Sequence, residues 1–261
     1  MLILIAESKT MNISQSTIEN DILECHQPLF EHQANQIVSW LNSLSLQELA
    51  SVIGISLSLA QKTKKLLYEF PFKHTGETAM SAFTGEVFKA LDYNSLDQEA
   101  KEYLSARIRI ISSLYGLLFP ADIIKPYRLD YNKNCAPEGK SLINFWKQIL
   151  TIALVKNLKE NGVNEILNLL PGDADKFLDW KVIKAFANVV KIDFKIFNSH
   201  GLKTPHAGLL KALRGNFIRM LAINQVASIK DIFTIQTDNF IYSPENSKPD
   251  YPMFISTELS V

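Results

Sequence analysis

The chain has 261 residues, 47% of them apolar and 10% aromatic, enough to bury a substantial core in one large or two small domains. Its 27 basic and 27 acidic residues balance, so no overall charge draws it to nucleic acid or to an anionic membrane. Any site for a polyanion must therefore come from a local cluster. Only two cysteines, Cys25 and Cys135, are present, which is too few for a disulfide framework and fits a reducing compartment.

The N-terminal run "MLILIAESKT" has no basic region before it and no small-residue cleavage pattern. No later stretch reaches about 18 uninterrupted apolar residues, the length of a membrane helix. We therefore expect a soluble, cytoplasmic protein that has no membrane partner.

The first predicted element is a strand over residues 2–6, a short continuous apolar run that suits burial on both faces. A helix is predicted over about 29–44. Ser45 then opens "SLQE", whose Glu48 completes a capping box for a helix to about residue 53. Gly54 provides a sharp turn because glycine tolerates positive φ, and a second helix follows over 58–70.

Helices and strands also interleave in the rest of the chain. "EVFKAL", residues 86–91, is predicted as a strand after a turn at Gly85, and residues 95–107 as a helix with a Ser95–Gln98 capping box. The other predicted elements are strands over 108–116, 165–170 and 189–197, helices over 141–160, 173–187 and 204–225, and strands near 233–237, 240–243 and 251–256. Thr204 and Pro205 are the predicted start of the helix over 204–225.

This order predicts a single α+β domain over residues 1–261, with a mixed sheet core wrapped by helices. A small helical insertion at about 45–70 fits a helix-hairpin-helix pattern.

Three basic groups are candidates for an anion site. The first is the hairpin near Gly54, where free amides at a helix start favour a phosphate and Lys62, Lys64 and Lys65 follow within reach. The alternative is that Gly54 only makes the turn that any pair of antiparallel helices needs.

The second group is "LLKALRGNFIR". Lys211 and Arg214 share a helix face, Arg219 lies off it, and Gly215 allows another backbone or a ligand to approach closely. No Asp or Glu occurs between Asp193 and Asp231, so local acidic partners are scarce. A solvated helix face is the alternative.

The third group lies in "SSLYGLLFPADIIKPYRLDYN", residues 112–132, where Lys125, Tyr127 and Arg128 surround a proline. Arg107 and Arg109 lie on the strand before it. Arginine grips a phosphate bidentately, and tyrosine donates a hydrogen bond or stacks on a base. Taken alone, these are turn residues.

Searches for catalytic and metal-binding motifs give little. The five histidines show no HExxH spacing, and GxSxG, Walker A and GxGxxG sequences are absent, so we expect no catalytic residues, no metal and no cofactor. Asp173 and Asp175 are predicted as helix-start residues. Cys135 lies near Lys133 and Lys140, whose charges would lower the pKa of its thiol and make it oxidisable. The alternative is an inert thiol.

Several motifs occur together in the order and spacing of a known family. "MLILIAESKTM", "AFTGEVFKAL", "ISSLYGLLFPADIIKPYRLDYN", "LINFW" and "LKALRGNFIR" resemble the YaaA family of bacterial peroxide-stress-resistance proteins over nearly the whole chain. The resemblance implies resistance to hydrogen peroxide, limitation of free iron and binding of double-stranded and distorted DNA. It also implies a mixed fold with a helix-hairpin-helix element and a positively charged cleft.

The resemblance further implies that four groups of residues assemble around that cleft. These DNA-binding candidates are Lys9 with Thr10, the hairpin from Gly54 to Lys65, Arg109 with Lys125, Tyr127 and Arg128, and Lys211 with Arg214 and Arg219. Three positions depart from the family pattern. Ala6-Glu7-Ser8 replaces Ser-Pro-Ala, and Phe119 replaces an arginine. Leu213 precedes Arg214 in a segment that has one basic residue fewer than the same segment of the family. Each loss of a basic residue predicts weaker DNA binding and a shallower salt dependence.

Two further hypotheses stand beside DNA binding. The first is an enzyme that acts on a nucleotide or nucleic-acid phosphate in the same cleft, with Glu7, Asp130 or Asp173 as the candidate base or metal ligand. The second is iron binding, which the absent ligand spacing weakens. The sequence does not determine the oligomeric state, and a monomer is the working expectation.

Overall fold

The computed structural model describes residues 1–12, 26–71 and 76–256. The helices are α1 (Glu31–Ser43), α2 (Leu46–Ile53), α3 (Leu57–Glu69), α4 (Ala79–Ala82), α5 (Glu86–Leu91), α6 (Gln98–Arg107), α7 (Leu142–Glu160), α8 (Gly172–Asp175), α9 (Trp180–Ile183) and α10 (Ala207–Ile223). The strands are β1 (Leu2–Ala6), β2 (Glu77–Thr78), β3 (Ile108–Ser112), β4 (Gly116–Leu118), β5 (Ile123–Ile124), β6 (Glu165–Asn168), β7 (Asn188–Lys191), β8 (Asp193–Asn198), β9 (Gly201–Lys203), β10 (Ile241–Tyr242) and β11 (Met253–Ser256). This α+β composition confirms the predicted fold class.

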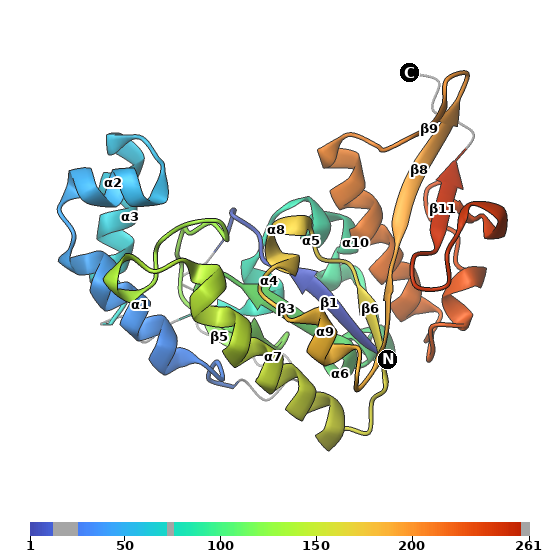
Figure 1. Ribbon diagram of the computed structural model, residues 1–261, viewed down its shortest axis with the longest axis horizontal. Coiled ribbons are helices and arrows are strands. Elements are labelled where there is room, and N and C mark those ends of the chain that lie inside the picture. Colours follow the sequence, from blue (N-terminus) through green and yellow to red (C-terminus); the bar gives the residue numbers. More distant parts are fainter. Residues whose placement is uncertain (13–25, 72–75, 257–261) are drawn as a thin grey trace.

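A five-stranded sheet, in the order β4-β3-β1-β6-β7, forms the centre of the molecule (Figure 1). β1 pairs in parallel with both β3 and β6, β6 pairs in parallel with β7, and β4 is an antiparallel edge strand. The chain passes from β1 to β3 on one side and then crosses to β6 on the other. The order therefore reverses between β1 and β6, the place where open sheets of this kind bind ligands at their carboxyl ends.

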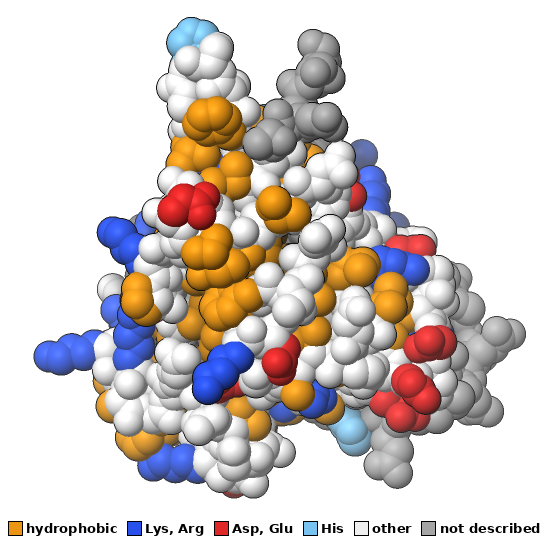
Figure 2. All heavy atoms as spheres, turned by 90° about the vertical axis from the view of Figure 1, so that its right-hand side faces the viewer, with side chains coloured by type: hydrophobic (Ala, Val, Ile, Leu, Met, Phe, Trp, Pro, Cys, Tyr) orange, Lys and Arg blue, Asp and Glu red, His pale blue; other side chains and the backbone are white. Residues whose placement is uncertain are grey.

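A second sheet of four strands, in the order β10-β11-β8-β9, lies to the right in Figure 1. α10 packs on it through Phe217, whose ring centroid lies 5.0 Å from that of Phe254 and 6.0 Å from that of Phe194. On the face shown in Figure 2, hydrophobic side chains form a band among scattered charged ones. Exposed apolar residues of this sheet include Phe197, Leu202 and Ile241.

Locally encoded elements formed where the sequence predicted them. β1 is almost wholly buried, and Ser45 and Glu48 make the reciprocal capping box at the start of α2. Gly54 has φ of 71° and ends α2 in the left-handed conformation. α1, α3 and α7 also lie within or near their predicted ranges.

Three predictions of local structure were wrong. "EVFKAL" is helix α5 rather than a strand, because burial of Phe88 and Leu91 three positions apart follows the helical period. The helix predicted over 173–187 is two short helices, since the Asp179 side chain accepts hydrogen bonds from Lys181 N and Val182 N and starts α9 anew. Residues 233–237 form no strand: the first two end a 3₁₀ helix, Asp231–Thr234, and Thr237 forms only an isolated bridge with Phe240.

Helix caps and one strand also differ from the prediction. Asp97, not Ser95, caps α6, and His206, not Thr204, caps α10. The strand predicted over 189–197 is divided between the two sheets, because β7 ends at Lys191 and β8 begins at Asp193. The alternating pattern was correct, but it carries no information about which sheet a strand joins.

Candidate functional site

A cavity of about 480 Å³ opens at the carboxyl ends of β1 and β6, where the strand order reverses. Its walls come from the segment after β1, the start of α5, residues 129–131, the segment after β6, and α10. The lining residues are Ile5, Ala6, Glu7, Ser8, Lys9, Thr10, Gly85, Glu86, Val87, Phe88, Leu129, Asp130, Tyr131, Leu169, Pro171, Asp173, Lys211 and Arg214.

The cavity has an apolar floor and a charged mouth. Ile5, Phe88, Leu129 and Leu169 are buried and form the floor. The ionisable side chains of the lining are four acids, Glu7, Glu86, Asp130 and Asp173, and three bases, Lys9, Lys211 and Arg214. The lining therefore carries mixed charge, and the positively charged cleft stays a prediction.

Glu7 is held by hydroxyl groups from the end of β3 and from the segment after β5. Ser113 Oγ donates a hydrogen bond to one carboxyl oxygen of Glu7, and Tyr127 OH donates to the other. Ser112 Oγ accepts from the amides of Leu114 and Tyr115, so its own proton is available for Tyr127 OH, 2.8 Å away. The hydroxyl chain thus ends on the Glu7 carboxylate as the acceptor.

Burial controls the ionisation of Glu7. It raises the pKa of Glu7 to about 7, although the hydrogen bonds from Ser113 and Tyr127 favour the charged form and oppose the rise. Burial likewise raises the pKa of Tyr127 and Tyr131 well above their ordinary values, with the Glu7 charge acting in the same direction. Glu7 is therefore partly protonated near neutral pH.

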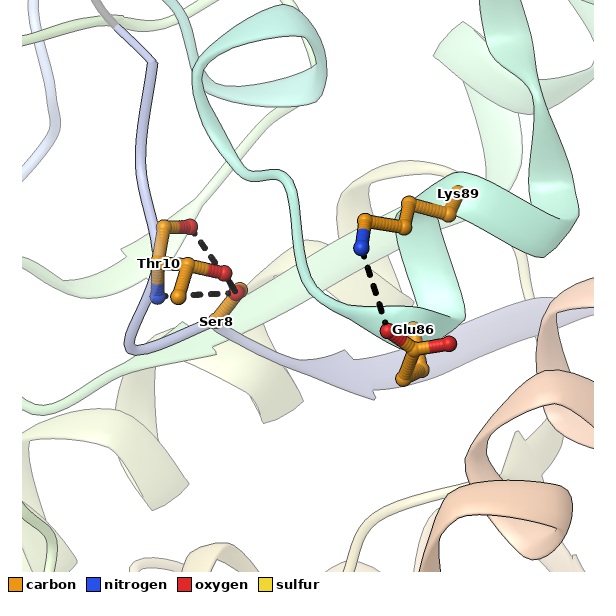
Figure 3. Close-up of polar contacts among 4 residues, drawn as sticks. All are labelled: Ser8, Thr10, Glu86 and Lys89. Carbon is orange, nitrogen blue, oxygen red and sulfur yellow. Dashed lines mark hydrogen bonds and ion pairs between the residues drawn. The ribbon is translucent and has the colours of Figure 1, made fainter.

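Two walls of the cavity are joined by an ion pair and a tight turn. Lys9 Nζ lies 2.5 Å from Asp130 Oδ1. In the turn, Thr10 N donates to Ser8 Oγ at 3.1 Å, and Glu86 pairs with Lys89 at 3.2 Å nearby (Figure 3). A Cβ on Gly85 would come within 2.4 Å of Ser8 Oγ, so glycine is what allows this turn to lie against α5.

Close packing of α10 on α5 brings the two cations of α10 to the cavity. A Cβ on Gly215 would lie 2.2 Å from the Val87 carbonyl oxygen, so the two backbones meet directly. Lys211 is exposed, whereas Arg214 is half-buried. Burial lowers the pKa of Arg214, and Asp193 opposes this, but a guanidinium stays charged at neutral pH.

Comparison with known proteins identifies the family. A family model described as peroxide stress protein YaaA matches residues 1–246. The chain belongs to the YaaA family. It is 30% identical to a UPF0246 protein of Shewanella sp. strain MR-4 over 98% of both chains, and 29% identical to one of Alteromonas mediterranea over the full length of both. It is 28% identical to a UPF0246 protein of Francisella tularensis subsp. novicida, over 95% of this chain and 96% of that one.

Of the thirteen candidate DNA-binding residues, four line the cavity of this YaaA-family protein: Lys9, Thr10, Lys211 and Arg214. Tyr127 lies next to them, but its hydroxyl is engaged by Glu7 and Ser112. Lys125 lies apart, because its Nζ donates to the Phe70 carbonyl at 2.9 Å and covers the Phe70 ring. Arg128 is half-buried and forms no hydrogen bond or ion pair with another described residue.

The α2–α3 hairpin does not contribute to the cavity lining. Lys64 Nζ donates to the carbonyls of Asn42 and Leu44 at 2.7 and 2.6 Å, and so caps the end of α1. Lys65 forms a long ion pair with Glu69, and Lys62 is exposed. Lys133 is a neighbour of Gly54 that the sequence did not predict. Its Nζ would lie 2.5 Å from a Cβ placed on Gly54.

Two predicted arginines of this YaaA-family chain bind backbone carbonyls rather than lining the cavity. Arg109 is 4% exposed, donates to the Ile108 carbonyl at 2.7 Å and stacks on Phe119, with a pKa that burial lowers to about 10. Arg219 donates to the carbonyls of Leu91 and Asp92 at 2.9 and 3.0 Å, at the end of α5. In both cases the cation binds backbone carbonyls of the protein itself, at or next to the end of a helix.

The redox and metal candidates are also placed. Cys135 is fully buried, and burial raises the pKa of its thiol to about 12, which favours the inert alternative. Among the residues that the structure describes, no group of three His, Cys, Asp or Glu side chains is arranged to hold a metal ion. Cys25 and His74 lie outside those residues.

No helix in the described ranges is long and apolar enough to cross a membrane.

Proposed function

We propose that this protein serves the peroxide-stress role of its family by binding DNA, with phosphates held at the cavity mouth by Lys211, Arg214 and Lys9. Binding would be directed at backbone shape rather than base sequence, since the lining offers phosphate donors and no base-reading set. Duplex and distorted DNA are both expected ligands.

The observation that carries the proposal is the state of Arg214. Its guanidinium is half-buried at the cavity, yet it has no hydrogen bond and no ion pair within 4 Å among the described residues. Asp193 is the carboxylate whose charge acts on Arg214, and it is paired with Lys195 Nζ at 2.9 Å. A desolvated guanidinium with five free donors is suited to bidentate contact with a phosphate.

Lys211 supports the same conclusion. It lies three residues before Arg214 on one face of α10, is exposed, and has no ion-pair partner among the described residues. Lys9 would be released from Asp130 when a phosphate competes for it, because an exposed ion pair contributes little. The mixed charge of the lining predicts modest affinity with clear salt dependence.

The α2–α3 hairpin is a second proposed contact with DNA, as a helix-hairpin-helix element. Ser56 caps the start of α3, and Lys62 on the same helix is exposed without a partner among the described residues. Lys64 contributes to the hairpin by fixing it to α1 rather than by binding phosphate. DNA covered in this way would be shielded from damage by peroxide and iron, which is how we connect binding with the limitation of iron damage.

The test is fluorescence anisotropy with bulged and fully paired duplexes at two salt concentrations, with divalent metal present and the DNA checked for cleavage. The Lys211→Ala, Arg214→Ala double variant should lose most binding. A Lys147→Ala, Lys181→Ala variant is the matched control, because it removes two exposed lysines that do not line the cavity. Equal binding by the wild type and the cavity variant would overturn the proposal.

A second candidate function is catalysis on a nucleotide or nucleic-acid phosphate in the same cavity. The observation in its favour is Glu7, a lining residue whose pKa of about 7 suits proton transfer at neutral pH. Both of its carboxyl oxygens accept hydrogen bonds from Ser113 and Tyr127, which anchors it in place. Turnover of a DNA substrate that Glu7→Gln abolishes would favour this function over binding alone.

A further inference from the structure

We infer that the cavity takes one whole nucleotide unit, a nucleoside monophosphate, with its base on the apolar floor and its phosphate at Arg214 and Lys211. The unit is either a free nucleotide or a nucleotide that has left the stack of bound DNA. The second source rests on the proposed function, whereas the first does not.

The size of the cavity selects this ligand class. A volume of about 480 Å³ falls within the range of roughly 300–1,000 Å³ that small-ligand pockets have. The major groove of duplex DNA alone is about 12 Å wide, so a paired duplex does not fit inside. A single nucleotide extruded from the helix is the part of DNA that does.

The floor offers a surface for a flat, apolar ring. Phe88, Leu129 and Leu169 are buried there, and the ring of Tyr131 adds a wall. Tyr131 is fixed in place, because its hydroxyl donates to the Ile111 carbonyl at 2.6 Å and its ring meets Phe177 edge-on at 5.1 Å. A rigid aromatic wall beside an aliphatic floor is suited to stacking any of the bases.

The mouth offers complementary polar groups at the right places. Arg214 is an unpaired, half-buried donor set for a phosphate, with Lys211 one helical turn away. Glu86 and Asp173 are exposed carboxylates at the starts of α5 and α8, and are able to accept hydrogen bonds from sugar hydroxyls or base amino groups. Carboxylates at the carboxyl ends of parallel strands bind ribose in doubly wound α/β sheets.

The charge of the lining favours a monophosphate over a triphosphate. Of the three lining cations, Lys9 is paired with Asp130, so only Lys211 and Arg214 are free to take phosphate charge, and an ionised Glu7 opposes each further negative charge. A single phosphate paired with Arg214 avoids most of that repulsion. Binding should therefore weaken from monophosphate to triphosphate.

The experiment uses the full chain and two kinds of probe. Titration calorimetry measures binding of the four deoxynucleoside monophosphates, their triphosphates and inorganic phosphate. Anisotropy measures binding of a duplex with a one-nucleotide bulge, the same bulge without its base, and the fully paired duplex. Val87→Trp is the test variant, because Val87 lines the cavity and the larger ring would occupy the floor. Val87→Phe adds less volume and carries the same test if the first variant fails to fold.

The inference predicts that monophosphates bind, that triphosphates bind more weakly, and that Val87→Trp lowers monophosphate affinity by about tenfold, within the range that base stacking supplies. In DNA, the bulge that keeps its base should bind more tightly than the abasic bulge. Val87→Trp should erase the preference for the bulge that keeps its base over the abasic bulge.

Two other results separate the claims. Binding of free monophosphates without binding of any DNA would support the cavity assignment and overturn the proposed function. Binding of all three DNA probes equally, with no binding of monophosphates, would overturn the nucleotide assignment and leave the proposed function standing.

Discussion

The backbones of Gly215 and Val87 are in direct contact, so that a Cβ at residue 215 would lie 2.2 Å from the Val87 carbonyl oxygen. The same Cβ would come within 2.8 Å of Ala90 Cβ and 3.0 Å of Leu91 N. This contact joins α10 to α5 and fixes the position of Lys211 and Arg214 at the cavity. The site thus depends on a residue that has no side chain.

Gly215→Ala tests that dependence. Alanine gains about 1 kcal/mol over glycine in a helix interior, whereas overpacking against backbone that cannot turn aside costs about 1–3 kcal/mol. We expect a net loss of stability in urea denaturation, together with weaker DNA binding, because α10 must shift. Gly208→Ala, at the first turn of α10, is the control, since its Cβ would meet only His206 ring atoms at 3.3 Å. Unchanged stability and binding in Gly215→Ala would contradict the packing argument.

Glu7→Gln should flatten the dependence of stability on pH. The pKa of Glu7 is raised from its ordinary 4.5 to about 7, so the folded state binds more protons than the unfolded state in that window. Stability in the wild type therefore falls as pH rises from about 4.5 to 7 and levels off above. Burial raises the pKa of Asp122 to about 7 as well, so both carboxyls contribute to the fall.

The measurement is the free energy of unfolding at pH 5, 6, 7 and 8 for the wild type and for Glu7→Gln. The difference between the two proteins isolates Glu7 from Asp122. Glu7→Gln should lose less stability than the wild type over this range. Parallel curves would mean that Glu7 is not shifted.

Cys135 should be inert toward peroxide in the folded protein. Burial raises the pKa of its thiol to about 12, so at neutral pH only about one molecule in 10⁵ carries the reactive thiolate. Mass spectrometry of the Cys135 peptide after peroxide treatment should show oxidation in unfolded protein and little in native protein. Rapid oxidation in the native state, or loss of peroxide resistance in Cys135→Ala, would contradict this assignment.

Lys64→Ala should destabilise the fold without changing DNA affinity. Lys64 Nζ donates two short hydrogen bonds to the carbonyls that end α1, and hydrogen bonds from a charged donor contribute about 1.5–3 kcal/mol. Lys62→Ala is its counterpart, because Lys62 is exposed and without a partner among the described residues. We expect that variant to keep its stability and to weaken DNA binding. Thermal unfolding and anisotropy are measured on both variants. Loss of DNA affinity in Lys64→Ala with unchanged stability, or loss of stability in Lys62→Ala with unchanged affinity, would contradict these two roles.

Local signals in the sequence were sufficient for several parts of the fold. The capping box of Ser45 and Glu48 and the turn at Gly54 lie within a few residues of what they control, so the sequence contains the whole interaction. α5 was missed because six residues are too short to show a helical period without knowledge of the partner helix. The divided strand over 188–198 was missed because neither sheet is visible from residue alternation.

The site was only partly predictable for the same reason. Gly215 was expected to admit a close neighbour, and the structure shows that the neighbour is the backbone of α5. The hydroxyl groups that hold Glu7 lie 106 and 120 residues away in the sequence, at Ser113 and Tyr127. Arg109 and Arg219 look like anion binders in the sequence because charge is visible there, whereas the carbonyls that they cap are not.

The most direct test of the central claim is the salt dependence of duplex binding by the wild type and by the Lys211→Ala, Arg214→Ala variant. Each lost phosphate contact should reduce the slope of log affinity against log salt by about 0.9. The account predicts weaker binding and a slope shallower by about 1.8 in the double variant, with no change in Lys147→Ala, Lys181→Ala. An unchanged slope in the double variant would show that DNA does not bind at this cavity.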